Sequence, residues 1–215
     1  MNAHAERAVE LIADIVFHST FPEKEMEKEK EVVIDEINSY MDNPMEQIYD
    51  DFECQVFKGQ PLGNPILGTH ESVRSFTRTD ILKFIKRFYS TDRMVFSYTG
   101  SLPFEQVRNL AELYFSGEGH KSSPSVAPRK RSPEITRVAQ KKSNIQAHYI
   151  AGSAAYSCHS SKRFALFLLN NILGGPGMNS RLNMNIREKY GFTYHIESAY
   201  VPFKDTGLFN IYLAT

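Results

Sequence analysis

The chain has 215 residues, of which 41% are hydrophobic and 23% are charged, and its 25 basic residues balance its 25 acidic ones. This composition is typical of a globular protein with one large domain or parts of two, and the neutral balance gives no reason to expect nucleic acid or an anionic membrane as a partner. The two cysteines, Cys54 and Cys158, show no metal-binding spacing, and no apolar run approaches the roughly 18 residues of a membrane span.

The first predicted element is a helix over residues 2–17, in which four apolar residues recur at helical spacing: Ala8, Leu11, Ile12 and Ile15. No basic region precedes this apolar stretch, so it is not a secretory signal, and the compartment stays open between cytoplasm and periplasm. The chain opens inside this helix and closes at Thr215 without a cap or a charged tail. We therefore expect it to be an internal piece of a larger protein.

The next two predicted helices are separated by a short break. Pro22 can begin the first of them, because its missing N–H costs nothing at a helix start. This helix runs to about Met41, and Asn43-Pro44 then breaks it. The second helix covers residues 45–58 and contains three candidate core residues, Ile48, Phe52 and Phe57.

The rest of the first stretch is predicted to hold a loop, two helices and one strand. A loop rich in Gly and Pro covers 59–72, and Thr79-Asp80 caps a helix over 81–88. The segment MVFSYTG, residues 94–100, is predicted to be a buried strand that ends in a turn. An amphipathic helix over 103–115 completes this stretch.

Residues 117–134, GEGHKSSPSVAPRKRSPE, are rich in Gly, Ser, Pro and Lys and are predicted to form a linker. The basic run Arg129–Arg131 within them is too short for a nucleic-acid footprint and fits a solvated linker. We therefore place a domain boundary here, between a first part at 1–116 and a second part at 135–215.

The second part is predicted to consist of a strand, two helices and a hairpin. The strand is QAHYIAG, the helices cover 161–173 and 180–189, and the strands FTYHIESAY and GLFNIYL pair across the turn PFKDT. Gly174–Gly177 ends the first helix and Gly191 ends the second. In the first hairpin strand four residues alternate to one face: Phe192, Tyr194, Ile196 and Tyr200. The chain is thus predicted to be an α+β protein with mixed or antiparallel sheets and helices packed on one face.

Two carboxylates, Glu29 and Glu36, lie two turns apart in the helix that follows Pro22. Their spacing rotates them by only about 20° relative to each other and separates them by roughly 10 Å along the axis. Glu36 is predicted to lie outside the solvated part of the helix, because Val32, Val33 and Tyr40 border it. A carboxylate among apolar side chains needs a cation, a hydrogen-bond donor or a metal as its partner. A run rich in Glu and Lys is also typical of an exposed face with i,i+4 ion pairs.

The segment FPEKEMEKEKEVVIDEINSYMDNPMEQIYDDF resembles the part of pitrilysin/insulinase-family zinc peptidases that follows their inverted H-x-x-E-H motif. In that family one helix carries Glu, six residues and Glu. The resemblance therefore implies Glu36 as the third zinc ligand and Glu29 as a supporting catalytic carboxylate. The likeness continues through PLGNPILGTHESVRSFT and DILKFIKRFYSTDRMVFSYTG and covers nearly the whole chain. It implies two partial metallopeptidase-like domains.

A second signature, SRLNMNIREKYGFTY, resembles the family's second domain, from which an Arg and a Tyr reach into the zinc site. On this match they are Arg187 and Tyr194. The implied roles are a charge-assisted hold on the substrate backbone and stabilisation of negative charge on the attacked carbonyl oxygen. Without the resemblance, Arg187 fits a cation in the last turn of a helix, and Tyr194 fits a core residue of a strand.

The inverted motif itself is absent from the sequence, because none of the seven histidines stands in an H-x-x-x-H or H-x-x-E-H pair. The resemblance implies a parent zinc endopeptidase that acts on short or unfolded peptides. This piece alone is expected to be inactive and to lack zinc, because catalytic zinc requires three protein ligands. The alternatives are a non-catalytic peptide-binding or scaffold member of the family, or a protein that shares only the fold. Peptides are the expected partners, and unpaired sheet edges are expected to favour homo-oligomers.

Overall fold

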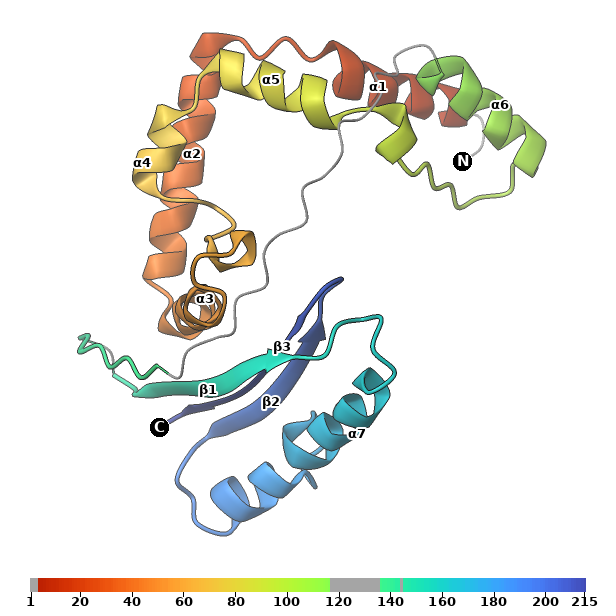
Figure 1. Cartoon of the computed structure of the whole chain (residues 1–215). Helices are drawn as coiled ribbons and strands as arrows, with labels where there is room; N and C mark the ends of the chain where they lie inside the picture. The colour runs from red at the N-terminus through yellow and green to blue at the C-terminus, as the bar shows by residue number, and fades with distance from the viewer. Residues whose placement is uncertain (1–3, 117–135, 144) are drawn as a thin grey trace. The chain divides into compact units, whose positions relative to one another are not determined.

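The structure, a computed structural model, describes residues 4–116, 136–143 and 145–215 (Figure 1). Among these residues, no helix has the length and apolar character that crossing a membrane requires. The predicted linker at 117–134 lies outside the described residues.

The chain divides into two compact units that are not continuous in sequence. The first unit combines Met1–Val33 with His70–Ala127, and the second combines Ile34–Thr69 with Pro128–Thr215. The sequence predicted two consecutive parts separated by the linker. Because the linker lies outside the described residues, this division stays a prediction. Each unit is described separately below.

The described part of the first unit is built from helices. They are α1 (Ala5–His18), the start of α2 (Glu23–Met41), α4 (His70–Ser75), α5 (Arg78–Phe88) and α6 (Phe104–Phe115). Helices α1 and α6 pack through an edge-to-face contact between Phe17 and Phe115, whose ring centroids lie 5.5 Å apart. Val9 and Ala13 are buried on the same stripe of α1 as Phe17, at steps of four residues. The predicted stripe that includes Leu11 is exposed, because α6 covers the stripe of Val9, Ala13 and Phe17 instead.

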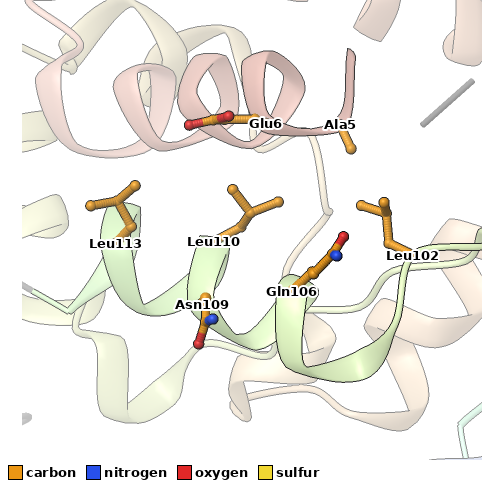
Figure 2. A pocket seen from close by; sticks show the side chains of 7 residues that line it. All are labelled: Ala5, Glu6, Leu102, Gln106, Asn109, Leu110 and Leu113. Carbon is orange, nitrogen blue, oxygen red and sulfur yellow. The ribbon is translucent and has the colours of Figure 1, made fainter. Parts of the chain in front are cut away.

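A groove with a volume of about 380 Å³ runs between α1 and α6. Leu102, Leu110 and Leu113 line one side, and Ala5 and Glu6 of α1 face them (Figure 2). The Glu6 carboxylate accepts a hydrogen bond from the hydroxyl of Tyr114, at 3.3 Å. The groove is therefore mainly apolar, and its one carboxylate already has a donor.

The predicted strand over 94–100 is wrong, since these residues form no strand. Val95 is 89% exposed, and Phe96 contacts Phe115 edge-to-face with ring centroids 5.7 Å apart. A strand needs a hydrogen-bonded neighbour, and the described part of this unit contains no strand that could pair with it. The short helix α4, which begins at His70, was assigned to a loop because of the Gly and Pro residues before it.

The second unit is built on a three-stranded antiparallel sheet. Its strands are β1 (His148–Ala155), β2 (His195–Pro202) and β3 (Gly207–Ala214). The strand order is β1-β3-β2, so β3 is the central strand. Strands β2 and β3 form the predicted hairpin, with Pro202 opposite Gly207 across the turn. Strand β1 pairs with the other side of β3, with His148 opposite Ala214.

Helix α3 (Pro44–Val56) packs on one face of this sheet (Figure 1). Phe52, and Phe57 just beyond the helix, form a buried cluster with Leu208 of the central strand. Fully burying a side chain of this size stabilises the fold by about 1.5–3 kcal/mol. Two of the three predicted core residues are thus confirmed, while Ile48 is only partly buried.

Helix α7 (Arg163–Gly174) packs on the opposite face. Phe167 contacts Tyr200 of β2 edge-to-face, with ring centroids 4.8 Å apart. The helix ends at Gly174, as predicted. Glycine is required there, because a Cβ atom would lie only 2.7 Å from the backbone nitrogen of Ser198. This residue therefore both ends the helix and permits its close approach to β2.

The predicted α+β class and the antiparallel sheet are confirmed. One detail differs, because the sheet carries a helix on each face rather than helices on one face only (Figure 1). Val201, and not Tyr200, lies opposite Leu208, so Tyr200 and Leu208 point to different faces. Both are buried, and each face therefore needs its own cover.

Helix α5 of the first unit begins with a complete capping box. Thr77 is the N-cap, and its hydroxyl oxygen accepts a hydrogen bond from the N–H of Asp80 at 3.3 Å. The Asp80 carboxylate in return accepts from the N–H of Thr77 at 3.0 Å. The Thr77 hydroxyl also donates to Oδ2 of Asp80 at 2.6 Å, and this bond, followed by the one from the Thr77 N–H, holds the pKa of the Asp80 carboxyl below its usual value. The predicted cap at Thr79-Asp80 is wrong by two residues, because the helix begins at Arg78 and places Asp80 at its third position.

Thr77→Ala is expected to destabilise the chain by about 1 kcal/mol, because the backbone N–H of Asp80 loses its acceptor. Thr79→Ala is the matched control, since Thr79 is an exposed residue inside the same helix. Urea unfolding followed by circular dichroism at 222 nm measures both. Equal losses for the two variants would contradict this assignment of the cap.

Candidate functional site

Glu29 and Glu36 both lie on α2, as predicted, and both are exposed. The buried residues of this helix are Ile34 and Ile37. Ile34 precedes Glu36 by two residues, which places it about 200° away around the helix axis. The carboxylate of Glu36 therefore projects away from the buried stripe.

The prediction that Glu36 is shielded from solvent is wrong for the described residues. Val32 and Tyr40, which border it one turn before and one turn after, are themselves 50% and 45% exposed. Shielding by these side chains requires a further segment to cover all three of them. The carboxylate instead stands in an exposed stripe of mixed apolar and acidic character.

Ion pairs on α2 involve other residues. Two pairs occupy its first turns: Lys28 with Glu25 at 2.9 Å, and Lys30 with Glu27 at 2.7 Å. Neither Glu29 nor Glu36 has a hydrogen-bond or ion-pair partner among the residues that the structure describes. Glu25 lies one turn before Glu29 and therefore on its side of the helix, whereas Glu27 precedes Glu29 by two residues and points about 200° away from it.

Arg187 lies on a single turn of π-helix, η4 (Asn183–Glu188), where an α-helix was predicted. Its Nε and Nη2 atoms donate to one carboxylate oxygen of Glu188, at 3.0 and 2.8 Å. Gly191 ends this segment, as predicted, because its φ of 63° is left-handed and its N–H donates to the Arg187 carbonyl. Single π-helical turns are rare and frequently occur at functional sites.

Tyr194 is 88% exposed and lies directly before β2. The predicted alternation is confirmed for Ile196 and Tyr200, which are buried. It is wrong for Phe192 and Tyr194, which are exposed, because the strand begins only at His195.

Thr193 anchors the segment that carries Tyr194. It is buried, and its hydroxyl lies 2.7 Å from the carbonyl oxygen of His195 and also within hydrogen-bonding distance of the carbonyl oxygen of Ala214, at the end of β3. The same hydroxyl accepts from the N–H of His195 at 3.2 Å. With Thr193 held inward, Tyr194 projects to solvent from a fixed point.

The structure brings some of the predicted site residues into one unit. Glu36, Arg187 and Tyr194 belong to the second unit, and Glu29 belongs to the first. Within the described ranges, no hydrogen bond or ion pair joins any two of these four, and no group of three His, Cys, Asp or Glu side chains could hold a metal. Because a catalytic zinc site uses three protein ligands, the residues present do not by themselves fit a zinc ion.

A polar cluster between α3 and the sheet was not predicted from the sequence. The hydroxyl of Tyr49 donates to Oε1 of Glu197 at 2.7 Å, and the hydroxyl of Tyr212 lies 2.8 Å from Nδ1 of His148. Burial, and then the hydrogen bond to Glu197, raise the pKa of Tyr49, and burial also raises the pKa of Tyr212. Both phenols therefore stay protonated and able to donate. The alternation of side chains along the strands predicts that these strand residues share one face of the sheet. It does not predict that Tyr49 of α3 contacts them.

Comparison with known families identifies the chain. The family model described as "Insulinase (Peptidase family M16)" matches residues 1–70, and the model described as "Peptidase M16 inactive domain" matches residues 75–215. The chain belongs to the insulinase family, peptidase family M16. The predicted pitrilysin/insulinase resemblance is thereby confirmed.

The chain spans about half the length of the M16 relatives that it matches. It is 33% identical to "Uncharacterized zinc protease YmxG" of Bacillus subtilis and 36% identical to an "Uncharacterized zinc protease" of Rickettsia bellii, in each case over 100% of this chain and 52% of the relative. Its structure is similar to that of a protease from Helicobacter pylori, with a TM-score of 0.85, 19% identity, and coverage of 99% of this chain and 52% of that chain. At this identity the structural likeness shows the fold alone.

Thr193→Val is expected to destabilise the chain by about 1–3 kcal/mol, because the variant keeps the shape but removes the single hydroxyl proton that the carbonyl oxygens of His195 and Ala214 share. Thr206→Val is the matched control, since the hydroxyl of Thr206 makes only a 3.5 Å contact with the carbonyl of Gly207. Urea unfolding measures both variants. A loss for Thr193→Val no larger than that of the control would contradict the anchoring role.

Proposed function

We propose that the protein containing this chain is a zinc-dependent endopeptidase that hydrolyses short or unfolded peptides. In this proposal Glu36 is one metal ligand and Glu29 is a supporting carboxylate. Arg187 and Tyr194 hold the substrate. The observation that carries the proposal is the match of the whole chain to relatives named zinc proteases, in a family whose two models cover both groups of site residues.

The setting of Glu36 supports its role as a ligand. A metal ligand must be deprotonated and must not be held by a competing cation. Glu36 is exposed, while the lysines of α2 that form ion pairs bind Glu25 and Glu27 instead. The described residues supply no further ligands beside it, so the other ligands belong to residues beyond these.

The settings of Arg187 and Tyr194 support their role in holding a peptide. The contact with Glu188 uses Nε and Nη2 of Arg187, which orients the guanidinium and leaves the two N–H groups of Nη1 for another acceptor. Such donors suit the carbonyl groups of a peptide backbone. The exposed hydroxyl of Tyr194 can donate to a carbonyl oxygen that gains negative charge during hydrolysis.

The rival function is peptide binding or scaffolding without catalysis. One observation favours it: the family model that matches residues 75–215 is described as an inactive domain. The two functions differ in whether the protein binds zinc at Glu36 and turns over a peptide.

We also propose that this chain self-associates through its sheet edges. Strands β1 and β2 each pair with β3 on one side only within the described sheet. Unpaired backbone groups on an edge strand favour pairing with a strand of another copy. Light scattering over a concentration series is expected to show a rising mass, and a monomer at every concentration would rule the proposal out.

The proposed function is tested in the full-length protein by measuring zinc content and hydrolysis of an unfolded fluorogenic peptide. Glu36→Gln is expected to lose zinc and activity together. Glu29→Gln, Arg187→Ala and Tyr194→Phe are expected to retain zinc and to lower kcat/KM, by about 10²–10³-fold where a charge-stabilising donor is removed. Glu31→Gln, which changes an exposed carboxylate of the same helix, is the control and should leave both quantities unchanged.

Two results would contradict this account. A Glu36→Gln variant with full zinc content excludes Glu36 as a ligand. A wild-type protein that binds peptides without zinc or turnover establishes the rival function. The 215-residue chain by itself is expected to retain substoichiometric zinc and to hydrolyse nothing, because it lacks two ligands.

A further inference from the structure

The strand register gathers polar residues on the face of the sheet that α3 covers. Tyr212 of β3 lies opposite Glu197 of β2. Two residues further on, Ala214 lies opposite both His195 and His148. Residues that are opposite each other, or two apart in one strand, point to the same face. A polar strip therefore crosses all three strands at one end of the sheet.

Tyr49 connects α3 to this strip. Its ring lies against the ring of Tyr212, with centroids 5.3 Å apart, and its hydroxyl donates to Oε1 of Glu197 at 2.7 Å. The other carboxylate oxygen of Glu197 lies 3.5 Å from Nε2 of His195. On the far side, His148 contacts the hydroxyl of Tyr212 at 2.8 Å. The Glu197 carboxylate thus contacts both Tyr49 of α3 and His195, while Tyr212 and His148 contact each other.

This strip and the apolar core act differently on α3. The cluster of Phe52, Phe57 and Leu208 favours burial of the helix but is tolerant of small shifts, because hydrophobic contact has no preferred direction. A short hydrogen bond from a phenol to a carboxylate depends on direction and distance. Loss of either partner leaves the other partly buried without its bond. The Tyr49–Glu197 pair is therefore a directional contact between α3 and the strands.

We propose that the Tyr49–Glu197 hydrogen bond is a positioning latch that fixes the helix segment carrying Glu36 relative to the strand that follows Tyr194. The connections on both sides are short. Helix α2 ends at Met41 and α3 begins at Pro44, while β2 begins at His195. The inference rests on the proposed function, since it assigns the latch to the spacing of that site. Tyr49 and Glu197 are positioning residues and touch neither substrate nor metal.

The latch is tested first in the 215-residue chain by hydrogen–deuterium exchange of the backbone amides of α3. Tyr49→Phe and Glu197→Ala are each expected to raise the exchange rate of α3 by about tenfold or more. The double variant should add little, since both changes remove one bond. Glu197→Gln should restore protection, because its amide oxygen still accepts from Tyr49. Tyr149→Phe is the control, because Tyr149 is an exposed strand residue with no hydrogen-bond partner among the described residues.

The second test uses the full-length protein and a peptide substrate. Tyr49→Phe is expected to keep its zinc and its KM and to lose about tenfold in kcat, and Glu197→Gln is expected to keep the wild-type kcat. Unchanged exchange in Tyr49→Phe, or additive effects in the double variant, overturns the latch whatever the activity. Wild-type protein without hydrolysis overturns the proposed function and the catalytic role of the latch, while the exchange result still decides whether the bond holds α3.

Discussion

The packing of α3 on the sheet is the contact on which the arrangement of the second unit depends. Phe52 and Phe57 supply the apolar part against Leu208, and Tyr49 supplies a directional hydrogen bond to Glu197. Helix α3 lies in the segment matched by the first family model, while the strands lie in the segment matched by the second. The contact therefore unites two parts of the sequence that family comparison separates. It is also the reason that Glu36 shares a compact unit with Arg187 and Tyr194.

Much of the secondary structure could be predicted from local pattern. The helix from residue 23 to Met41, its break at Asn43-Pro44 and the final hairpin have strong local signals, and the structure has all three. The predictions fail where the structure of a segment depends on its contact with another residue or strand. The apolar segment 94–100 has strand-like composition but no neighbouring strand within the described residues, so it forms no strand and is mostly exposed. The N-cap of α5 was misplaced because Thr77 and Thr79 are both suitable N-cap residues. Only Thr77 is followed three residues later by a carboxylate, that of Asp80, which completes the capping box.

In the candidate site, too, features set by neighbouring residues could be predicted, and features set by residues distant in the sequence could not. Local spacing places Glu29 and Glu36 on one side of a helix, and the structure has them there. Spacing alone did not reveal that Glu36 is exposed, because burial depends on what packs against Val32 and Tyr40. The roles assigned to Arg187 and Tyr194 came from family resemblance and stay predictions. Their supports, Glu188 and Thr193, were missed, because the anchoring of Thr193 depends on the end of β3, which lies 21 residues further along the chain.

The central claim is that Glu36 is a ligand of zinc in the complete molecule. Crystals of the full-length protein, with anomalous diffraction recorded on both sides of the zinc absorption edge, test it directly. We expect a zinc peak at about 2.0–2.2 Å from a carboxylate oxygen of Glu36. A zinc ion bound elsewhere, or a Glu36 side chain in solvent with no metal beside it, would contradict the claim.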